Sequence, residues 1–178
     1  MHDSSPLSPE HITLVDANVF ISAGTPGTSK HRRFRRAVRR AGVTCLVPSR
    51  VEEELEQGGV KPALERTQDE GWAKTVDAPT VSHSKATTAQ DIARRAIASK
   101  SPDKDEHDVE KADLVFAGLA VEYLLEKKTA DNVTVITADR IACEAIETAI
   151  SSLGYTGQVS SITLWDLIDE ADDDLTLI

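Results

Sequence analysis

The sequence predicts an α/β domain built on a parallel sheet with helices on both faces. Short apolar runs bounded by polar residues, the pattern of buried strands, occur at 12–16, 43–47, 132–137 and 159–164. Segments with helical spacing separate these runs, an alternation typical of parallel sheets. A chain of 178 residues is long enough for one domain with a core and too short to presume two.

The first third of the chain is predicted to form a strand, a loop and a helix. A flexible leader over residues 1–10 precedes the strand at 12–16, and an Asn18-containing turn and a loop rich in Gly, Thr and Ser follow it. From Lys30 to Ala41, apolar residues recur at three- and four-residue intervals with arginines between them, which predicts an amphipathic helix. Gly42 ends this helix.

The middle of the chain is expected to be mostly helical. Pro48-Ser49 opens a helix after the second strand, and Gly58-Gly59 ends it. The long segment around Leu114 to Leu125 is apolar nearly all round, so its helix is buried on more than one side. The remaining expected segments are a helix at 60–72, a short strand at 74–77, a polar loop at 82–88, and helices at 89–98 and 106–127.

The last third repeats the alternation. A helix from Arg140 to Leu153 follows the strand at 132–137, and Gly154 is its natural terminator. A short acidic helix or tail follows the last strand. The expected organisation is therefore one globular unit over residues 11–168, with an acidic tail over 169–178.

Charge is distributed unevenly in this acidic chain. The net charge is −10, yet the stretch Lys30–Arg40 contains seven basic residues and no acid, so nucleic-acid binding is not excluded. Acidity with few lysines also resembles proteins from high-salt cytoplasm. No apolar stretch approaches the roughly 20 residues of a membrane span, and no secretory signal is visible. Both cysteines, Cys45 and Cys143, fit buried free thiols, and a cytoplasmic protein is expected.

Two of the strand-like runs end on an aspartate, Asp16 and Asp139. In open α/β sheets, ligand-binding and active sites lie just beyond the carboxyl ends of the strands. Carboxylates gathered there repel one another and lose hydration unless a divalent cation lies among them. The pattern therefore indicates a metal site with hard oxygen ligands, of the kind used in phosphoryl chemistry. Helix capping is the alternative role for each aspartate, and Asn18 and Thr137 have ordinary turn and strand roles as alternatives.

Two acids between these strands complete the candidate set. Three glutamates follow one another in the helix after Pro48, where Val51 and Leu55 mark the buried side. Glu54 flanks that side, Glu52 is expected to be the most solvated, and Glu53 is the reserve candidate. Asp113 lies in the apolar helix, where an unpaired charge is expensive, with Glu110 one turn earlier as its partner. A place on the exposed face is the alternative for Asp113.

Taken together, these segments resemble the PIN-domain family of metal-dependent ribonucleases. The matching motifs lie across residues 12–164, and the first and last are the most specific. They are Val15–Phe20, Pro48–Leu55, Ala112–Ala120 and Val135–Arg140.

The resemblance implies a three-layer α/β/α sandwich with a five-stranded, mainly parallel sheet. It also implies an acidic pocket that holds Mg²⁺ or Mn²⁺ and hydrolyses RNA. Many relatives are toxins of toxin–antitoxin pairs, and others process ribosomal RNA or act in RNA decay. Carried over residue by residue, the acidic quartet is Asp16, Glu54, Asp113 and Asp139, with Asn18, Thr137 and Glu110 in supporting roles.

The basic helix is the expected RNA contact, because phosphate backbones are bound mainly by Lys and Arg. The expected contacts are Arg32, Arg35, Arg36 and Arg39. The candidate partners are an RNA substrate, an antitoxin protein and a second copy of the chain. Two rival functions stay open. One is a PIN-like module that binds RNA or protein without cutting. The other is a phosphatase of the haloacid-dehalogenase type, which would need a second Asp where Asn18 stands.

Overall fold

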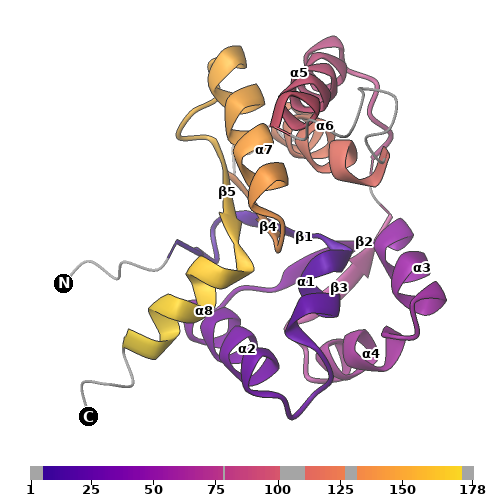
Figure 1. Cartoon of the computed structure of the whole chain (residues 1–178), viewed down its shortest axis with the longest axis vertical. Helices are drawn as coiled ribbons and strands as arrows, with labels where there is room; N and C mark the ends of the chain where they lie inside the picture. Colours follow the sequence, from indigo (N-terminus) through magenta and orange to yellow (C-terminus); the bar gives the residue numbers. More distant parts are fainter. Residues whose placement is uncertain (1–5, 78, 101–110, 127–131, 174–178) are drawn as a thin grey trace.

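Five parallel strands form the centre of the molecule, in the order β3-β2-β1-β4-β5 (Figure 1). The structure is a computed structural model that describes residues 6–77, 79–100, 111–126 and 132–173, with the backbone alone for residues 111–115 and 170–173. The strands are β1 (Ile12–Val15), β2 (Cys45–Pro48), β3 (Ala73–Val76), β4 (Val133–Thr137) and β5 (Val159–Thr163).

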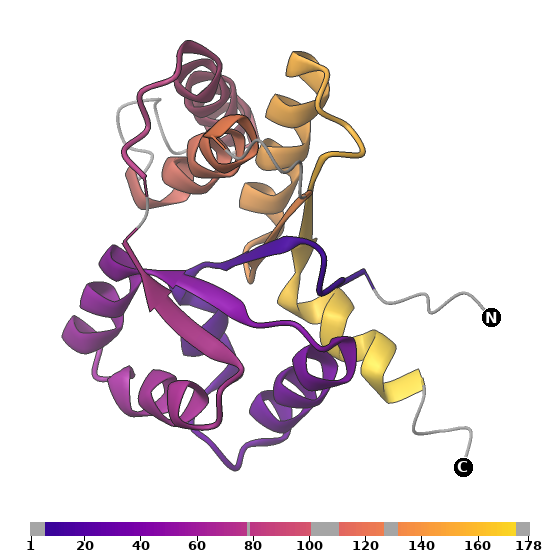
Figure 2. The same cartoon turned by 180° about the vertical axis from the view of Figure 1, so that it is seen from behind.

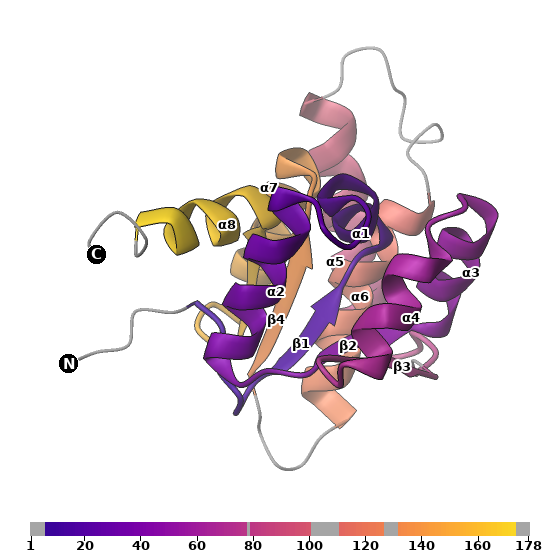
Figure 3. The same cartoon turned by 90° about the horizontal axis from the view of Figure 1, so that it is seen from below.

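Helices cover both faces of the sheet and give the three-layer sandwich that the sequence predicts. Figures 1 and 2 show α5, α6 and α7 together on one face, and α1 to α4 with α8 on the other. In Figure 3 the second group is drawn nearer to the viewer, while α5 and α6 are fainter and lie behind the strands. The helices are α1 (Ala17–Ala23), α2 (Ser29–Ala41), α3 (Ser49–Gln57), α4 (Lys61–Asp69), α5 (Ser84–Lys100), α6 (Lys111–Glu126), α7 (Arg140–Leu153) and α8 (Leu164–Asp173).

The strand order reverses between β1 and β4. The chain first builds the sheet outward through β2 and β3, then crosses through α5 and α6 and returns to place β4 on the free side of β1. Such a reversal leaves a crevice beyond the carboxyl ends of the two strands, because the loops that leave them run to opposite faces of the sheet. Asp16 follows β1 and Ala138 follows β4, so both strand-end segments lie at this crevice.

Two local expectations were wrong, each because a tertiary contact decides the structure. The turn expected around Asn18 is the helix α1, whose buried residues include Val19 and Phe20. The polar loop expected at 82–88 is helical from Ser84, because Ala86 and Ala89 form a buried face while the polar side chains point outward. In the segments predicted to be leader and tail, Leu7 is buried in the core and α8 continues to Asp173.

The beginning of α5 is fixed by a buried acid on α6. Glu122 is 3% exposed, and its carboxylate accepts hydrogen bonds from Ser82 N and Oγ at 3.3 and 3.0 Å and from His83 N at 3.2 Å. These donors precede the first turn of α5, where a negative charge is favourable. The acid therefore joins α5 to α6 and sets where the helix starts.

Other expectations concern the thiols and the membrane. Cys45 is a buried free thiol whose pKa burial raises to about 12, while Cys143 is free and only partly buried. Among the described residues, none of the helices has the length and apolar character to span a bilayer.

Replacing Glu122 with Gln is expected to destabilise the fold by about 2 kcal/mol, since hydrogen bonds to a charged group are worth about 1.5–3 kcal/mol. An amide group would also place a donor against His83 N–H. Glu126→Gln, an exposed change on the same helix, should alter the free energy of unfolding by less than about 0.5 kcal/mol. Urea unfolding measures both variants, and equal effects would show that Glu122 does not fix α5.

Candidate active site at the end of the sheet

Asp16 lies at the carboxyl end of the central strand β1. The residue is 8% exposed, and its backbone N–H donates to Ile136 O of β4 at 3.0 Å. It occupies the N-cap position of α1, yet its carboxylate accepts no capping hydrogen bond from that helix. The capping role considered from sequence is therefore not the one that Asp16 has in the described structure.

Asn18 joins the two strand ends across the crevice. Its Oδ1 accepts a hydrogen bond from Ala138 N at 2.8 Å, and its Nδ2 donates to Thr137 Oγ1 at 3.2 Å. Asn18 stands in the first turn of α1, two residues after Asp16, so these bonds hold the start of α1 against the end of β4. An amide suits this position because it offers a donor and an acceptor at once.

Asp139 combines a helix cap with a position at the same strand end. Its Oδ1 accepts hydrogen bonds from Ile141 N at 2.8 Å and from Ala142 N at 3.3 Å, so it caps α7. Helix capping is the alternative role predicted for this aspartate. Its own N–H donates to Thr137 Oγ1 at 3.3 Å. The cap leaves Oδ2 outside these bonds, and the side chain is exposed. Thr137 thus contacts both Asn18 and the Asp139 backbone.

The glutamates of α3 are arranged differently from the expectation for Glu52. Glu53 is the exposed member, while Glu52 and Glu54 are both partly buried. Each residue turns a helix by about 100°, so Glu53 points directly away from buried Val51 and Leu55, and its two neighbours flank that face. The Glu54 side chain is 39% exposed and its Oε1 lies 3.9 Å from Arg50 Nη2.

The four proposed acids are only partly placed by the structure. Asp113 belongs to α6, but its side chain lies outside the described residues, as does all of Glu110. Among the described side chains, no three His, Cys, Asp or Glu residues form a group that could hold a metal. Asp16 and Asp139 follow the two strands at the crevice, and their carboxylate oxygens are hard ligands suited in kind to Mg²⁺ or Mn²⁺.

An aromatic residue that the sequence reasoning missed also lies at this edge. Trp165, the second residue of α8, donates from Nε1 to Ala138 O at 2.8 Å. Lys30, in the first turn of α2, places Nζ 5.3 Å from the centre of the Trp165 ring. Applying the strand-end rule to the last strand would have found Trp165, because it follows β5 as Asp139 follows β4.

The basic helix α2 is held to the domain by its inner face. Phe34 is fully buried and meets the rings of Phe20 and Trp72 edge-on, at centroid distances of 6.2 and 5.4 Å. His31 is 3% exposed and meets Trp72 at 6.0 Å, and burial lowers its pKa. The outer face is therefore presented on a helix that aromatic packing holds in place.

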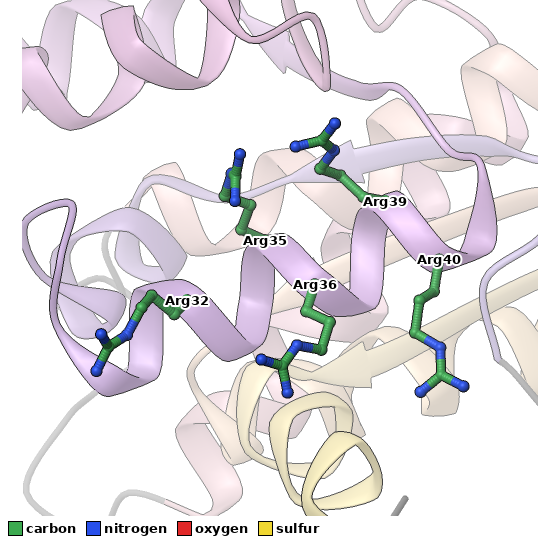
Figure 4. Close-up of a pocket in the computed structure, with 5 residues that line it drawn as sticks. All are labelled: Arg32, Arg35, Arg36, Arg39 and Arg40. Carbon is green, nitrogen blue, oxygen red and sulfur yellow. The ribbon is translucent and has the colours of Figure 1, made fainter. Parts of the chain in front are cut away.

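The outer face of α2 carries an arginine-lined pocket of about 410 Å³. Figure 4 shows Arg35 and Arg39 projecting to one side of the helix, and Arg36 and Arg40 to the side of α8. Arg35 is only partly buried and hydrogen-bonds Glu70, which also accepts from Trp72 Nε1 at 3.0 Å. These bonds, that from Arg35 foremost, lower the pKa of Glu70 to about 2.

The predicted RNA contacts thus fall into two groups. Arg32, Arg36 and Arg39 are exposed, and none of them has an ion-pair partner among the described residues. Arg35 is held by Glu70 and supports the packing of α2 against the turn that precedes β3.

Asn18→Ala removes both side-chain bonds across the crevice, so the free energy of unfolding should fall by about 1–2 kcal/mol. The Ala138 amide should also exchange its hydrogen faster, because its acceptor is lost. The control is Asn132→Ala at the opposite end of β4, which should leave Ala138 protected. Amide hydrogen exchange measures both, and unchanged protection at Ala138 in Asn18→Ala would contradict the bridging role.

Comparison with known proteins agrees with the fold. The halobacterial PIN domain family matches residues 9–176. No match was found among curated proteins or among solved structures. Because the matched segment contains every strand and helix that the structure describes, this chain belongs to the halobacterial PIN-domain family.

Proposed function

We propose that the protein is a Mg²⁺- or Mn²⁺-dependent endoribonuclease. PIN domains are generally nucleases, and the fold is of that nuclease type. The observation that supports the proposal most is the convergence of Asp16 and the Thr137–Asp139 segment at the crevice between β1 and β4, held there by Asn18. Two strand-end carboxylates at a topological switch point are a suitable base for a metal-dependent hydrolase.

In this proposal the acids of the crevice are the metal ligands. A bound divalent metal supplies an activated water and relieves negative charge on the phosphoryl oxygens and the leaving group. Asp16 and Asp139 would hold it from the strand ends, with Asp113 from α6 and Glu54 from α3 completing the set. Asn18 and Thr137 fix the backbone that carries the two strand-end acids, and Glu110 supports Asp113.

The exposed arginines of α2 are the proposed contact for the RNA backbone. Lys30, in the first turn of this helix, reaches Trp165, which is bonded to Ala138 beside the crevice. A strand of RNA leaving the crevice would therefore meet the outer face of α2. Arg32, Arg36 and Arg39 carry this role, while Arg35 is engaged by Glu70 and contributes mainly to the structure of the helix.

A second candidate is a PIN-like module that binds RNA or a protein without cutting it. Two observations favour it: Asp139 is used as a helix cap, and Glu54 lies beside Arg50. Metal dependence separates the two candidates, because a scaffold that does not cut needs no divalent cation. An antitoxin that binds the active form remains a proposed partner.

Asp16→Asn and Asp113→Asn each remove one ligand charge while keeping the side-chain shape. We expect RNA cleavage with Mn²⁺ to fall at least 100-fold in each variant. The thermal shift caused by Mn²⁺ should also shrink. Stability without metal should hold or rise, because clustered carboxylates repel one another. Asp91→Asn, a partly buried acid on α5, is the control.

Either of two results would contradict this assignment. One is an Asp113→Asn protein that unfolds more easily without metal yet keeps its cleavage rate. The other is a wild-type protein whose melting temperature and RNA cleavage are the same with Mn²⁺ and with EDTA, which is the behaviour of the scaffold candidate.

Changing Arg32, Arg36 and Arg39 together to Gln should weaken RNA binding similarly for all sequences. The slope of log affinity against log salt should flatten by about 2, if each arginine contacts one phosphate of a single strand. Fluorescence anisotropy at several salt concentrations, with an Asp16→Asn background that does not cut, measures the slope. The control changes Lys74, Lys85 and Arg95 to Gln, which removes three charges away from α2. Identical slopes in the two triple variants would refute the contact.

A further inference from the structure

We infer that Trp165, with Lys30 above its ring, is a stacking site for an unpaired nucleobase of the RNA. This inference rests on the proposed function, since it places the base next to the crevice where cleavage is proposed. It is carried by the position, the orientation and the surroundings of the indole ring in the described structure.

A hydrogen bond fixes the Trp165 ring to the backbone just beyond the end of β4. Trp165 Nε1 donates to Ala138 O at 2.8 Å, and Ala138 N donates to Asn18 Oδ1 at 2.8 Å. Ala138 stands between Thr137 and Asp139, so the indole edge lies against the strand end that bears the proposed ligand. A base on this ring would belong to a nucleotide close to the phosphate held in the crevice.

Trp165 packs against the border of the core but is less deeply buried than its helix neighbours. Leu164, Leu167 and Ile168 of the same helix are at most 4% exposed and form its buried side, whereas Trp165 is only partly buried. Thr163 Oγ1 accepts from Asp166 N at 3.1 Å, which starts α8 at this point and directs Trp165 to the strand end. The hydrogen bond uses the edge of the indole, and Lys30 lies over one of its faces.

A cation already lies over one face of the ring. Lys30 Nζ is 5.3 Å from the ring centre, and Lys30 itself is an exposed side chain. The Lys30 side chain is long and flexible. When a base stacks on the ring, the ammonium group can move from the ring to a phosphate oxygen. The pair therefore offers what a single nucleotide needs, an aromatic face for the base and a positive charge for the adjacent phosphate.

The chemistry of stacking selects the form of the RNA. A base inside a duplex is already stacked and paired, so its face is not available to a protein ring. An extruded or single-stranded base presents its full face to the indole. The expected ligand at Trp165 is therefore an unpaired nucleotide, with little preference for base identity because every base has a stacking face.

The test uses the full-length protein with Asp16→Asn, so that RNA is bound without being cut. Trp165→Leu should weaken binding of a single-stranded oligoribonucleotide by about 5- to 100-fold, and Trp165→Phe, which keeps an aromatic face, should lose much less. Binding of a matched RNA duplex should change by less than twofold in both. Thermal unfolding of each variant checks that the fold is retained.

Abasic RNA separates stacking from a structural role. A series of oligonucleotides, each lacking one base, should contain one position whose loss weakens binding to the Trp165 protein as much as Trp165→Leu does. The same abasic position should cost nothing further in Trp165→Leu, since the two changes remove one interaction. RNA binding should also quench the fluorescence of Trp165, measured against a Trp165→Phe protein that retains only buried Trp72.

The outcomes distinguish this inference from the proposed nuclease function. The stacking site would be overturned if Trp165→Leu weakened the binding of intact and abasic RNA equally, so that the two losses add. It would also be overturned if Trp165→Leu weakened the binding of duplex and single-stranded RNA equally. If wild-type protein cleaves RNA with Mn²⁺ while Trp165→Leu shows such additive losses, only the stacking site fails. If the abasic position and Trp165→Leu are non-additive but no metal-dependent cleavage occurs, the stacking site stands and the nuclease proposal fails.

Discussion

The pairing of β1 with β4 is the constraint on which the candidate site depends. The register runs from Ile12 opposite Val133 to Val15 opposite Ile136, so the two strands end at the same level. Parallel pairing alone places Asp16 beside Thr137, and the bonds of Asn18 then fix the backbone at Ala138. The pairing of β4 with β5 likewise brings Thr163 opposite Thr137, which places Trp165 two residues beyond the strand end, as Asp139 is beyond β4. A shift of one residue in any of these pairings would turn the site residues to the other face of the sheet.

Packing contacts of α2 keep its positive charge on the surface of an otherwise acidic protein. The chain carries a net charge of −10, yet α2 presents arginines on its outer face. Two devices keep that helix in place despite the repulsion among its charges: the aromatic contacts of Phe34, and the bond from Arg35 to Glu70. Because Glu70 neutralises an arginine at the inner border, the remaining positive charge is concentrated on the side that faces solvent. An acidic protein can in this way keep a local surface suited to a polyanion.

Much of the fold could be predicted from the sequence, because its strands are short apolar runs and its helices have clear ends. The helix α7 begins and ends at the predicted residues, Arg140 and Leu153, since Asp139 caps it and Gly154 takes the left-handed conformation after it. The start of α5 could not be predicted, because it depends on Glu122, an acid about 40 positions away. The strand-end acids were visible as a pattern. Trp165 occupies the corresponding position after β5, but it is not an acid, and its hydrogen bond to Ala138 is a tertiary contact that the sequence does not show.

The bridge made by Asn18 has a consequence for the order in which the protein is assembled. Asn18 and Thr137 are 119 positions apart, so a growing chain holds the first half of the crevice long before the second exists. The strands β1, β2 and β3 can pair as soon as Val76 has been made, but one edge of β1 then stays open until β4 docks. An open strand edge invites pairing with other chains. Contacts of high sequence separation form slowly, so we expect the docking of β4 to come late in folding. Any activity built on Asp16 and Asp139 therefore begins only when the sheet is complete.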